Sequence, residues 1–378
     1  MNTLPLSPRR LWAMVRKEFI QVRRDRLTFA MMVGIPVIQL AIFGFAINTD
    51  PKRLPTAAVV QDTSEFARSL VAAVEATGYF RIAATTGPAA AARMLERGDV
   101  QFVLTIPVDF SRRLVRGEVP AVLLEADASD PAATSNALAS LEPLARGALR
   151  HDLTGPLAQG TGASPPFEWR VHRLYNPEGI TQYNIVPGLM GVILTMTMII
   201  MTALGVTREL ERGTMENLLA MPVRPLEVIV GKILPYVLVG YIQVLVILLA
   251  AYYVFEVPMV GSVVWLGLCV LVFIVANLTV GITFSSLARN QTQAMQMSFF
   301  FFLPSILLSG FMFPFRGMPG WAQVIGEGLP LTHFLRLVRG ILLKGYGVAD
   351  SWPHLWPLLL FTAVVLGISL KRFRKTLD

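Results

Sequence analysis

The sequence predicts a polytopic α-helical membrane protein with six transmembrane helices and an extracytoplasmic mixed α/β domain. Hydrophobic residues make up 54% of the 378 residues and charged residues only 15%, whereas a typical soluble domain has about 25% charged residues. The apolar residues gather in six runs, each long enough for a helix of about 20 residues to cross a bilayer. Between the first two runs, short strand-like and helix-like patterns alternate.

The six runs also predict an orientation in the membrane. They lie at Leu27–Ile47, Tyr183–Val206, Val228–Phe255, Val263–Ala288, Ala294–Phe313 and Trp352–Leu370. An even number of spans places both termini on one side, and the basic residues beside the termini predict that this side is the cytoplasm. Arg336, Arg339 and Lys344 would then lie on the outer side, against the charge rule, and we interpret them as part of an interfacial helix.

Residues 1–26 are predicted to form a cytoplasmic amphipathic helix ahead of the first transmembrane helix, residues 27–47. Ser7 is a suitable N-cap and Pro8 a suitable first helical residue. Apolar residues then recur at helical spacing, with basic residues on the rest of the surface, which is typical of a helix lying on an anionic lipid surface. Two roles stay open for this helix, an orientation signal and a mechanical element.

Residues 48–178 are predicted to form a domain outside the membrane. Strand patterns occur at 56–62, 80–86, 100–107, 119–127 and 167–177, and helix patterns at 64–77, 87–99, 108–118 and 131–153. Alternation of this kind predicts α/β layers. A Gly- and Pro-rich stretch at 155–166 is predicted to be a flexible linker. The domain has no glycine-rich phosphate-binding motif, so nucleotide binding has no support there.

The last part of the chain, residues 179–378, is predicted to hold transmembrane helices 2–6. Its segment 314–345 is too polar to cross a bilayer and too apolar for a free loop, so we expect a pair of short helices that return into the outer leaflet. Trp321 suits an interfacial anchor. One apolar face combines Leu331, Phe334, Leu335, Val338, Ile341 and Leu342.

Several function classes are disfavoured by composition. The net charge of +8 is concentrated beside the apolar runs, which indicates membrane orientation and no nucleic-acid partner. One cysteine and four separated histidines predict neither an intrachain disulfide nor a metal site. The spans hold almost no ionisable side chains, which argues against an ion-driven carrier and an intramembrane hydrolase. No catalytic residue is predicted, and the chain is not expected to be an enzyme.

Polar and aromatic residues within the spans are candidates for a substrate path. Asn277 and Gln296 supply polar groups, and ordinary hydrogen bonding between helices is the alternative role for both. Beside Gln296 the fifth span is rich in phenylalanine, which suits lipophilic or aromatic substrates. The candidate residues are Asn277, Gln296, Phe299, Phe300 and Phe302.

The charged segment 207–227, between the second and third spans, is predicted to form a short helix on the cytoplasmic face. Gly213 permits a sharp entry, Thr214 can cap the helix and Pro222 ends it. A rigid helix with paired charges could fit a groove on a cytoplasmic partner, whereas the alternative is a solvated turn. The residues assigned to coupling are Arg208, Glu209, Glu211, Arg212, Gly213, Thr214, Glu216 and Pro222.

This segment resembles the coupling segment of type-2 ABC export permeases. The shared pattern is E-x-E-R-G-T-x-E-x-L-L-x-x-P-V-x-P-x-E-x-x-x-G-K-x-x-P, and it runs here from Glu209 to Pro235. Leu210 departs from it, because the family often has Arg or Lys there. The stretches RKEFIQVRRDR, IPVIQLAIFGFAIN and PLTHFLRLVRGILLKG resemble the family as well. The large insert after the first span matches the multidrug-export subgroup.

The resemblance implies the type-2 ABC exporter transmembrane fold and a function. It implies a permease subunit that moves amphipathic drugs or lipid-like compounds out across the bacterial inner membrane. The expected partners are cytoplasmic ABC ATPase subunits that bind ATP and magnesium, a second permease subunit of the same or a paralogous chain, and membrane lipid. A periplasmic adaptor is a further candidate partner, and no cofactor is expected in this chain.

The resemblance also places the second and fifth spans at the interface of the permease pair. An alternative function is an envelope-assembly or mechanotransmission subunit that acts on periplasmic partners. An ATP-independent channel is disfavoured, because nothing polar in the spans lines a continuous pore.

Overall fold

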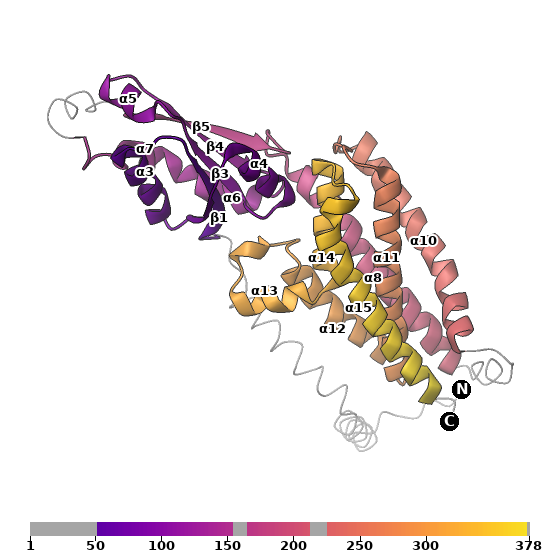
Figure 1. The fold of residues 1–378 in the computed structure, drawn as a ribbon. Coiled ribbons are helices and arrows are strands. Elements are labelled where there is room, and N and C mark those ends of the chain that lie inside the picture. The colour runs from indigo at the N-terminus through magenta and orange to yellow at the C-terminus, as the bar shows by residue number, and fades with distance from the viewer. Residues whose placement is uncertain (1–50, 154–164, 212–224, 376–378) are drawn as a thin grey trace, which may run out of the picture.

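The computed structural model describes residues 51–153, 165–211 and 225–375 (Figure 1). These residues form two parts, an α/β domain and a bundle of long helices. The two parts lie end to end (Figure 1). The amphipathic helix expected at 1–26, the first span and most of the Gly/Pro-rich linker lie outside the described residues. The coupling residues Arg212, Gly213, Thr214, Glu216 and Pro222 lie outside them too.

A five-stranded sheet with the order β2-β1-β3-β4-β5 forms the centre of the α/β domain. Its strands are β1 Leu54–Val60, β2 Phe80–Thr85, β3 Phe102–Ile106, β4 Ala121–Asp127 and β5 Glu168–Leu174. The β3–β4 pair is antiparallel and the other three pairs are parallel. The expected mixed α/β region is therefore confirmed, and β4 and β5 end side by side where the chain turns toward the helical bundle.

Helices cover both faces of this sheet. They are α3 Glu65–Ala76, α4 Pro88–Arg97, α5 Phe110–Val115, α6 Pro131–Ala139 and α7 Leu141–Gly147. Successive side chains of a strand point to opposite faces, so Ala57 and Val59 pack under α4. Leu54 and Phe102 pack on the other face, in a core shared with α3, α5 and α7. The domain thus has a complete core of its own.

The single helix predicted at 131–153 is wrong, because the chain divides at Ser140 into α6 and α7. Pro143 has no N–H to donate to the carbonyl of Ala139, and its ring crowds that carbonyl. The hydroxyl of Ser140 instead donates to the carbonyl of Ala137 at 2.6 Å.

Long apolar helices form the second part of the molecule. They are α8 Thr181–Glu211, α10 Pro225–Tyr253, α11 Val263–Leu287, α12 Gln291–Leu308 and α15 Val348–Lys375. Among the described residues, four helical stretches are long and apolar enough to cross a membrane: Thr181–Arg208, Pro235–Tyr253, Val263–Leu287 and Val348–Ser369. The predicted fifth span corresponds to the shorter α12, which is not among them. The count of six spans therefore stays a prediction.

Helix α11 lies at the centre of the bundle, where it packs against α8, α15 and the short helix α14, Pro330–Arg339. Ser262 caps its start by accepting a hydrogen bond from the backbone N–H of Trp265 at 3.3 Å. Phe273 of α11 stacks on Phe334 of α14, with ring centroids 4.0 Å apart. Gly281 brings α11 so close to α8 that an added Cβ would lie 2.7 Å from the carbonyl oxygen of Ile199.

The 314–345 segment contains short helices: η3 Phe315–Gly317, α13 Gly320–Glu327, α14 and the π-helical turn η4 Gly340–Lys344. Helix α13 leaves Trp321, Val324 and Ile325 exposed. Helix α14 is held inside the bundle. All six residues of the expected apolar face are buried: Leu331, Phe334, Leu335, Val338, Ile341 and Leu342.

Candidate functional site

The described part of the predicted coupling segment lies at the end of α8 that is farther from the α/β domain. The carboxylate of Glu211 accepts hydrogen bonds from the backbone N–H of Gln291, at 2.8 Å, and from its side-chain amide. These hydrogen bonds lower the pKa of Glu211, with a smaller contribution from Arg208. Gln291 is the first residue of α12, so Glu211 joins the end of α8 to the start of α12. Arg208 is exposed one turn earlier.

The backbone of Glu209 also lies in α8. The docking role of the whole segment, including the coupling residues outside the described ranges, stays a prediction.

The predicted substrate-path residues do not share one surface. Phe299 and Phe300 of α12 are exposed, whereas Phe302 packs against the core of the bundle. Asn277 is fully buried in α11, where its amide donates to the carbonyl of Phe273 at 2.8 Å. The side-chain oxygens of Asn277 and Gln296 are buried without a hydrogen-bond partner among the described residues. Asn277 therefore does not lie on the exposed phenylalanine surface in this conformation.

A second candidate site is the junction between the α/β domain and the helical bundle. Asp127 is the last residue of β4, and Lys344 is the last residue of η4. Their side chains form an ion pair and are only 9% and 6% exposed. The ring of Tyr175 lies 4.9 Å from the Lys344 ammonium group. Asp127 also accepts hydrogen bonds from the backbone and hydroxyl of Ser129, at 3.1 and 2.7 Å.

Asn184, in the first turns of α8, makes the next connection across the junction. Its amide Nδ2 donates to the carbonyl of Ser129 at 3.0 Å. Its Oδ1 accepts from Nη2 of Arg339 at 2.7 Å, and Nη1 of Arg339 donates to the carbonyl of Gly310 at 3.2 Å. Burial raises the pKa of the neighbouring Asp130, although the charge of Arg339 opposes that shift. One side chain of α8 thus bonds to both the α/β domain and α14.

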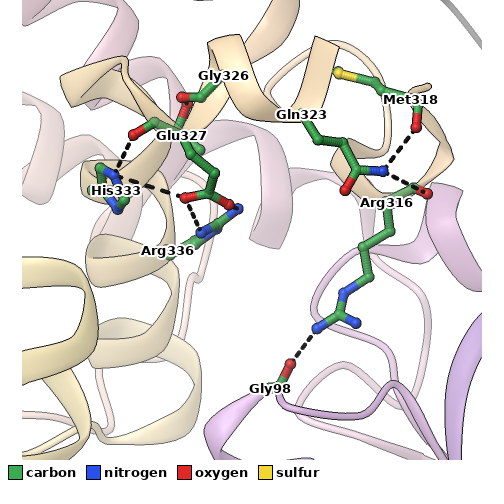
Figure 2. Close-up of polar contacts among 9 residues, drawn as sticks. Gly98, Arg316, Met318, Gln323, Gly326, Glu327, His333 and Arg336 are labelled. Carbon is green, nitrogen blue, oxygen red and sulfur yellow. Dashed lines mark hydrogen bonds and ion pairs between the residues drawn. The ribbon is translucent and has the colours of Figure 1, made fainter. Parts of the chain in front are cut away.

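The loop after α4 supplies a further contact with the 314–345 segment. The guanidinium of Arg316 donates to the carbonyl of Gly98 (Figure 2). Tyr346 donates its hydroxyl proton to the carbonyl of Glu96 at 2.9 Å. Gln323 of α13 donates to the carbonyl of Met318 at 2.7 Å and so fixes the turn that precedes α13 (Figure 2). The junction is therefore bonded on the side of α4 as well as at the end of β4.

Glu327, the last residue of α13, ties α13 to α14. Arg336 donates two hydrogen bonds to its carboxylate, at 3.0 and 2.6 Å, and Nε2 of His333 lies 2.8 Å from its carbonyl oxygen (Figure 2). Burial lowers the pKa of His333, although the hydrogen bond to Glu327 opposes that shift. The lowered pKa favours the neutral form of His333, and Glu327 balances the charge of Arg336.

A cavity of about 770 Å³ lies between these contacts. Its lining combines equal numbers of basic and acidic side chains: Arg97, Arg316, Arg336, Arg339 and Lys344 with Asp99, Asp127, Asp130, Glu327 and Asp350. None of the predicted substrate-path residues lines it.

This junction was not predicted from the sequence. Arg336, Arg339 and Lys344 were expected in an interfacial helix, whereas each of the three bonds to groups of the protein itself. Lys344 and Asp127 are 217 residues apart, so no local spacing could pair them. The only sequence signal was the unusual position of three basic residues on the predicted outer side.

Comparison with known proteins places the chain in a family. Residues 26–371 match the model of the ABC-2 family transporter proteins. The chain is 27% identical over 367 residues to the "Probable multidrug ABC transporter permease YbhR" of Escherichia coli K12, covering 97% of this chain and 98% of the relative. It is 28% identical over 380 residues to YbhS of the same strain, named in the same way, covering 100% of both chains.

A third relative is the "Inner membrane transport permease YhhJ" of Escherichia coli K12, 30% identical over 291 residues and 75% of each chain. The family match spans the α/β domain, helices α8 to α12 and most of α15. The chain therefore belongs to the ABC-2 family of transporter proteins and is a multi-pass membrane permease.

Proposed function

We propose that this chain is the permease subunit of an ATP-driven ABC exporter that moves amphipathic drugs or lipid-like compounds out across the inner membrane. The observation that carries the proposal is the family match over residues 26–371, together with the charged coupling pattern between α8 and α10. Two full-length relatives carry the name multidrug permease. ATP and magnesium bind to separate cytoplasmic ATPase subunits in this proposal, and both chain termini lie in the cytoplasm.

The proposed dimer places α8 and α12 at a two-fold interface, with the substrate cavity between two permease subunits. These helices pack side by side within one subunit, and both leave apolar side chains uncovered. On α8, Leu189, Ile193 and Met196 are exposed and share one helical face. Phe299 and Phe300 are exposed on α12. A surface of methionine, aliphatic and aromatic side chains suits lipophilic substrates of varied shape, because the methionine side chain adapts its conformation readily.

In the proposed cycle, ATP closes the ATPase pair and the coupling segment moves with it. The hydrogen bonds between Glu211 and Gln291 support this route, because they tie α12 to the end of α8 from which the coupling segment leaves. Movement of that segment would then displace both proposed interface helices together and open the cavity outward.

A second candidate function is a mechanotransmission subunit that acts on periplasmic partners through the α/β domain. The buried pair of Asp127 and Lys344 favours it, because that pair joins the α/β domain firmly to the bundle. Binding of a periplasmic adaptor by the α/β domain, without any effect of drugs on ATP hydrolysis, would favour this function over drug export.

The test of the proposed function uses the permease co-purified with its native ATPase and placed in lipid nanodiscs. We expect amphipathic drugs to stimulate ATP hydrolysis, and we expect Glu216→Lys to abolish that stimulation. Glu216 is predicted to lie at an exposed helix start, and a surface substitution usually costs less than about 0.5 kcal/mol of stability, so we expect this variant to fold. Glu142→Lys, at an exposed position of α7, is the matched charge-reversal control. Hydrolysis that no drug changes would refute drug export, and full stimulation in Glu216→Lys would refute the docking role.

A further inference from the structure

The buried ion pair at the junction fixes the position of the α/β domain. Removing two charges from water is costly, and their attraction repays that cost only with good geometry and additional hydrogen bonds. Asp127 has those additional bonds from Ser129, and Tyr175 lies against Lys344. An apolar pair could fill the same space without charge, but it would tolerate sliding. The ion pair instead has one favourable arrangement, so it specifies one position of the domain on the bundle.

The covalent connection between the α/β domain and α8 is also held in a fixed shape. Asn176 lies between β5 and α8 and is fully buried. Its side chain accepts from the backbone N–H of Ile180 and donates to the carbonyl of the same residue, both at 2.9 Å. Directly after this turn, Asn184 bonds to Ser129 and to Arg339. The connecting turn is therefore held in one shape, and the residue that bonds α8 to the α/β domain follows directly after it.

Helix α8 extends from this junction to the predicted coupling segment. Its 31 residues span about 46 Å at 1.5 Å per residue. Asn184 lies near one end and Glu211 at the other, where Glu211 bonds to α12. Along its length α8 packs against α11 with Gly281 at the contact. Pro187 removes one backbone hydrogen bond of α8 in the turn after Asn184. The helix is nevertheless held at that point, because Gly188 lies against Phe311 and Gly191 lies against Phe334. Packing of this kind lets α8 transmit a displacement from one end to the other.

We propose that the buried dock formed by Asp127, Lys344, Asn184 and Arg339 is the outer coupling site of the permease, through which the α/β domain is carried rigidly with α8 during the ATP cycle. The proposal rests on the proposed function for the source of the movement. It assigns Lys344 and Asp127 as positioning residues, which touch neither substrate nor nucleotide.

The first measurement is a distance within one subunit. Spin labels are placed at Val108 of the α/β domain and Val264 at the start of α11, both well exposed at 72% and 77%. The background is Cys269→Ala, and labelled permease is diluted with unlabelled permease in the complex with its ATPase. We expect one narrow distance that is the same without nucleotide and after vanadate trapping. A wild-type distance that changes between these states would overturn the proposal.

The second measurement removes the ion pair but keeps its volume. The variant Asp127→Asn with Lys344→Met should broaden the distance distribution and reduce drug-stimulated ATP hydrolysis at least fivefold, while basal hydrolysis changes less than twofold. The control is Glu142→Gln with Arg146→Met, which neutralises a pair that is 83% and 72% exposed. We expect the control to behave like the wild type. Full stimulation and a narrow distance in the first variant would overturn the proposal.

The two measurements separate failure of this inference from failure of the proposed function. If no drug stimulates the wild-type complex, the proposed function fails, and the wild-type distance still tests whether the domain is rigidly docked. If the ion-pair variant does not fold, the wild-type distance without nucleotide and after vanadate trapping still tests the proposal.

Discussion

A close backbone contact between α8 and α11 predicts a large effect from one added methyl group. A Cβ at Gly281 of α11 would lie 2.7 Å from the carbonyl oxygen of Ile199, 2.9 Å from Cβ of Thr202 and 3.3 Å from the backbone nitrogen of Ala203. Two of these atoms belong to the backbone of α8 and the third is fixed directly to it. None can move away by rotating a side chain. Gly281→Ala must therefore push α8 and α11 apart.

The magnitude follows from two opposing effects. Forcing an extra carbon into a packed interior costs about 1–3 kcal/mol, whereas replacing glycine by alanine inside a helix gains up to about 1 kcal/mol. Because the obstacle is backbone, the cost falls in the upper part of its range, and Gly281→Ala should lose about 1–2 kcal/mol of unfolding free energy. Gly267 lies in the same helix with nothing within 4 Å of its added Cβ. Gly267→Ala should therefore be neutral or slightly stabilising.

The assay compares the two variants with the wild type in one detergent. The temperature at which half of the protein leaves the folded, monodisperse state should fall by roughly 2–6 °C for Gly281→Ala and should not fall for Gly267→Ala. Equal stability of the two alanine variants would show that α8 and α11 do not approach as closely as the structure indicates. It would also remove the argument that α8 is rigidly supported along its length.

Two further predictions follow from other parts of the molecule. Burial raises the pKa of Asp62, but hydrogen bonds from Ser111 and Ser64 outweigh it and lower the pKa from 3.8 to about 2. The stability that these bonds contribute is therefore present above about pH 4 and lost as the pH falls toward 2. Asp62→Ala should cost about 2 kcal/mol at pH 7, and its difference from the wild type should shrink steadily as the pH falls from about 4 through about 2; a constant difference would contradict the assignment. Single cysteines along residues 294–308, in the Cys269→Ala background, should cross-link two permease subunits at helical spacing, with a yield that changes on vanadate trapping; no cross-link at any position would remove α12 from the dimer interface.

The long helices could be predicted from the sequence because their signal is local. The apolar runs Tyr183–Val206 and Val263–Ala288 lie within a few residues of the bounds of α8 and α11. The strands were also found from short apolar patterns between turns. The error at 131–153 arose because composition favoured a helix throughout, while a single proline decided where the chain divides. One residue outweighed the propensity of its neighbours.

The junction could not be predicted because its pairs depend on tertiary structure. The contact between Asn184 and Arg339 joins residues 155 positions apart, and that between Arg316 and Gly98 joins residues 218 positions apart. No periodicity links such residues, and each side chain alone is an ordinary polar residue. Asn277 was given two possible roles, a substrate contact and ordinary hydrogen bonding. Its amide donates to the carbonyl one turn earlier, and the substrate contact stays a prediction.

The three basic residues that contradict the charge rule have a structural explanation. The rule counts Lys and Arg residues in short loops beside the spans, and the anionic lipids of the cytoplasmic leaflet attract such side chains. Arg336 is balanced by Glu327, Lys344 by Asp127, and Arg339 is bonded to Asn184 with the charge of Asp130 nearby. Their charges are compensated inside the folded protein, so their number does not require a cytoplasmic position for the 314–345 segment. The orientation stays a prediction, and two of the three residues, Arg339 and Lys344, belong to the dock of the α/β domain.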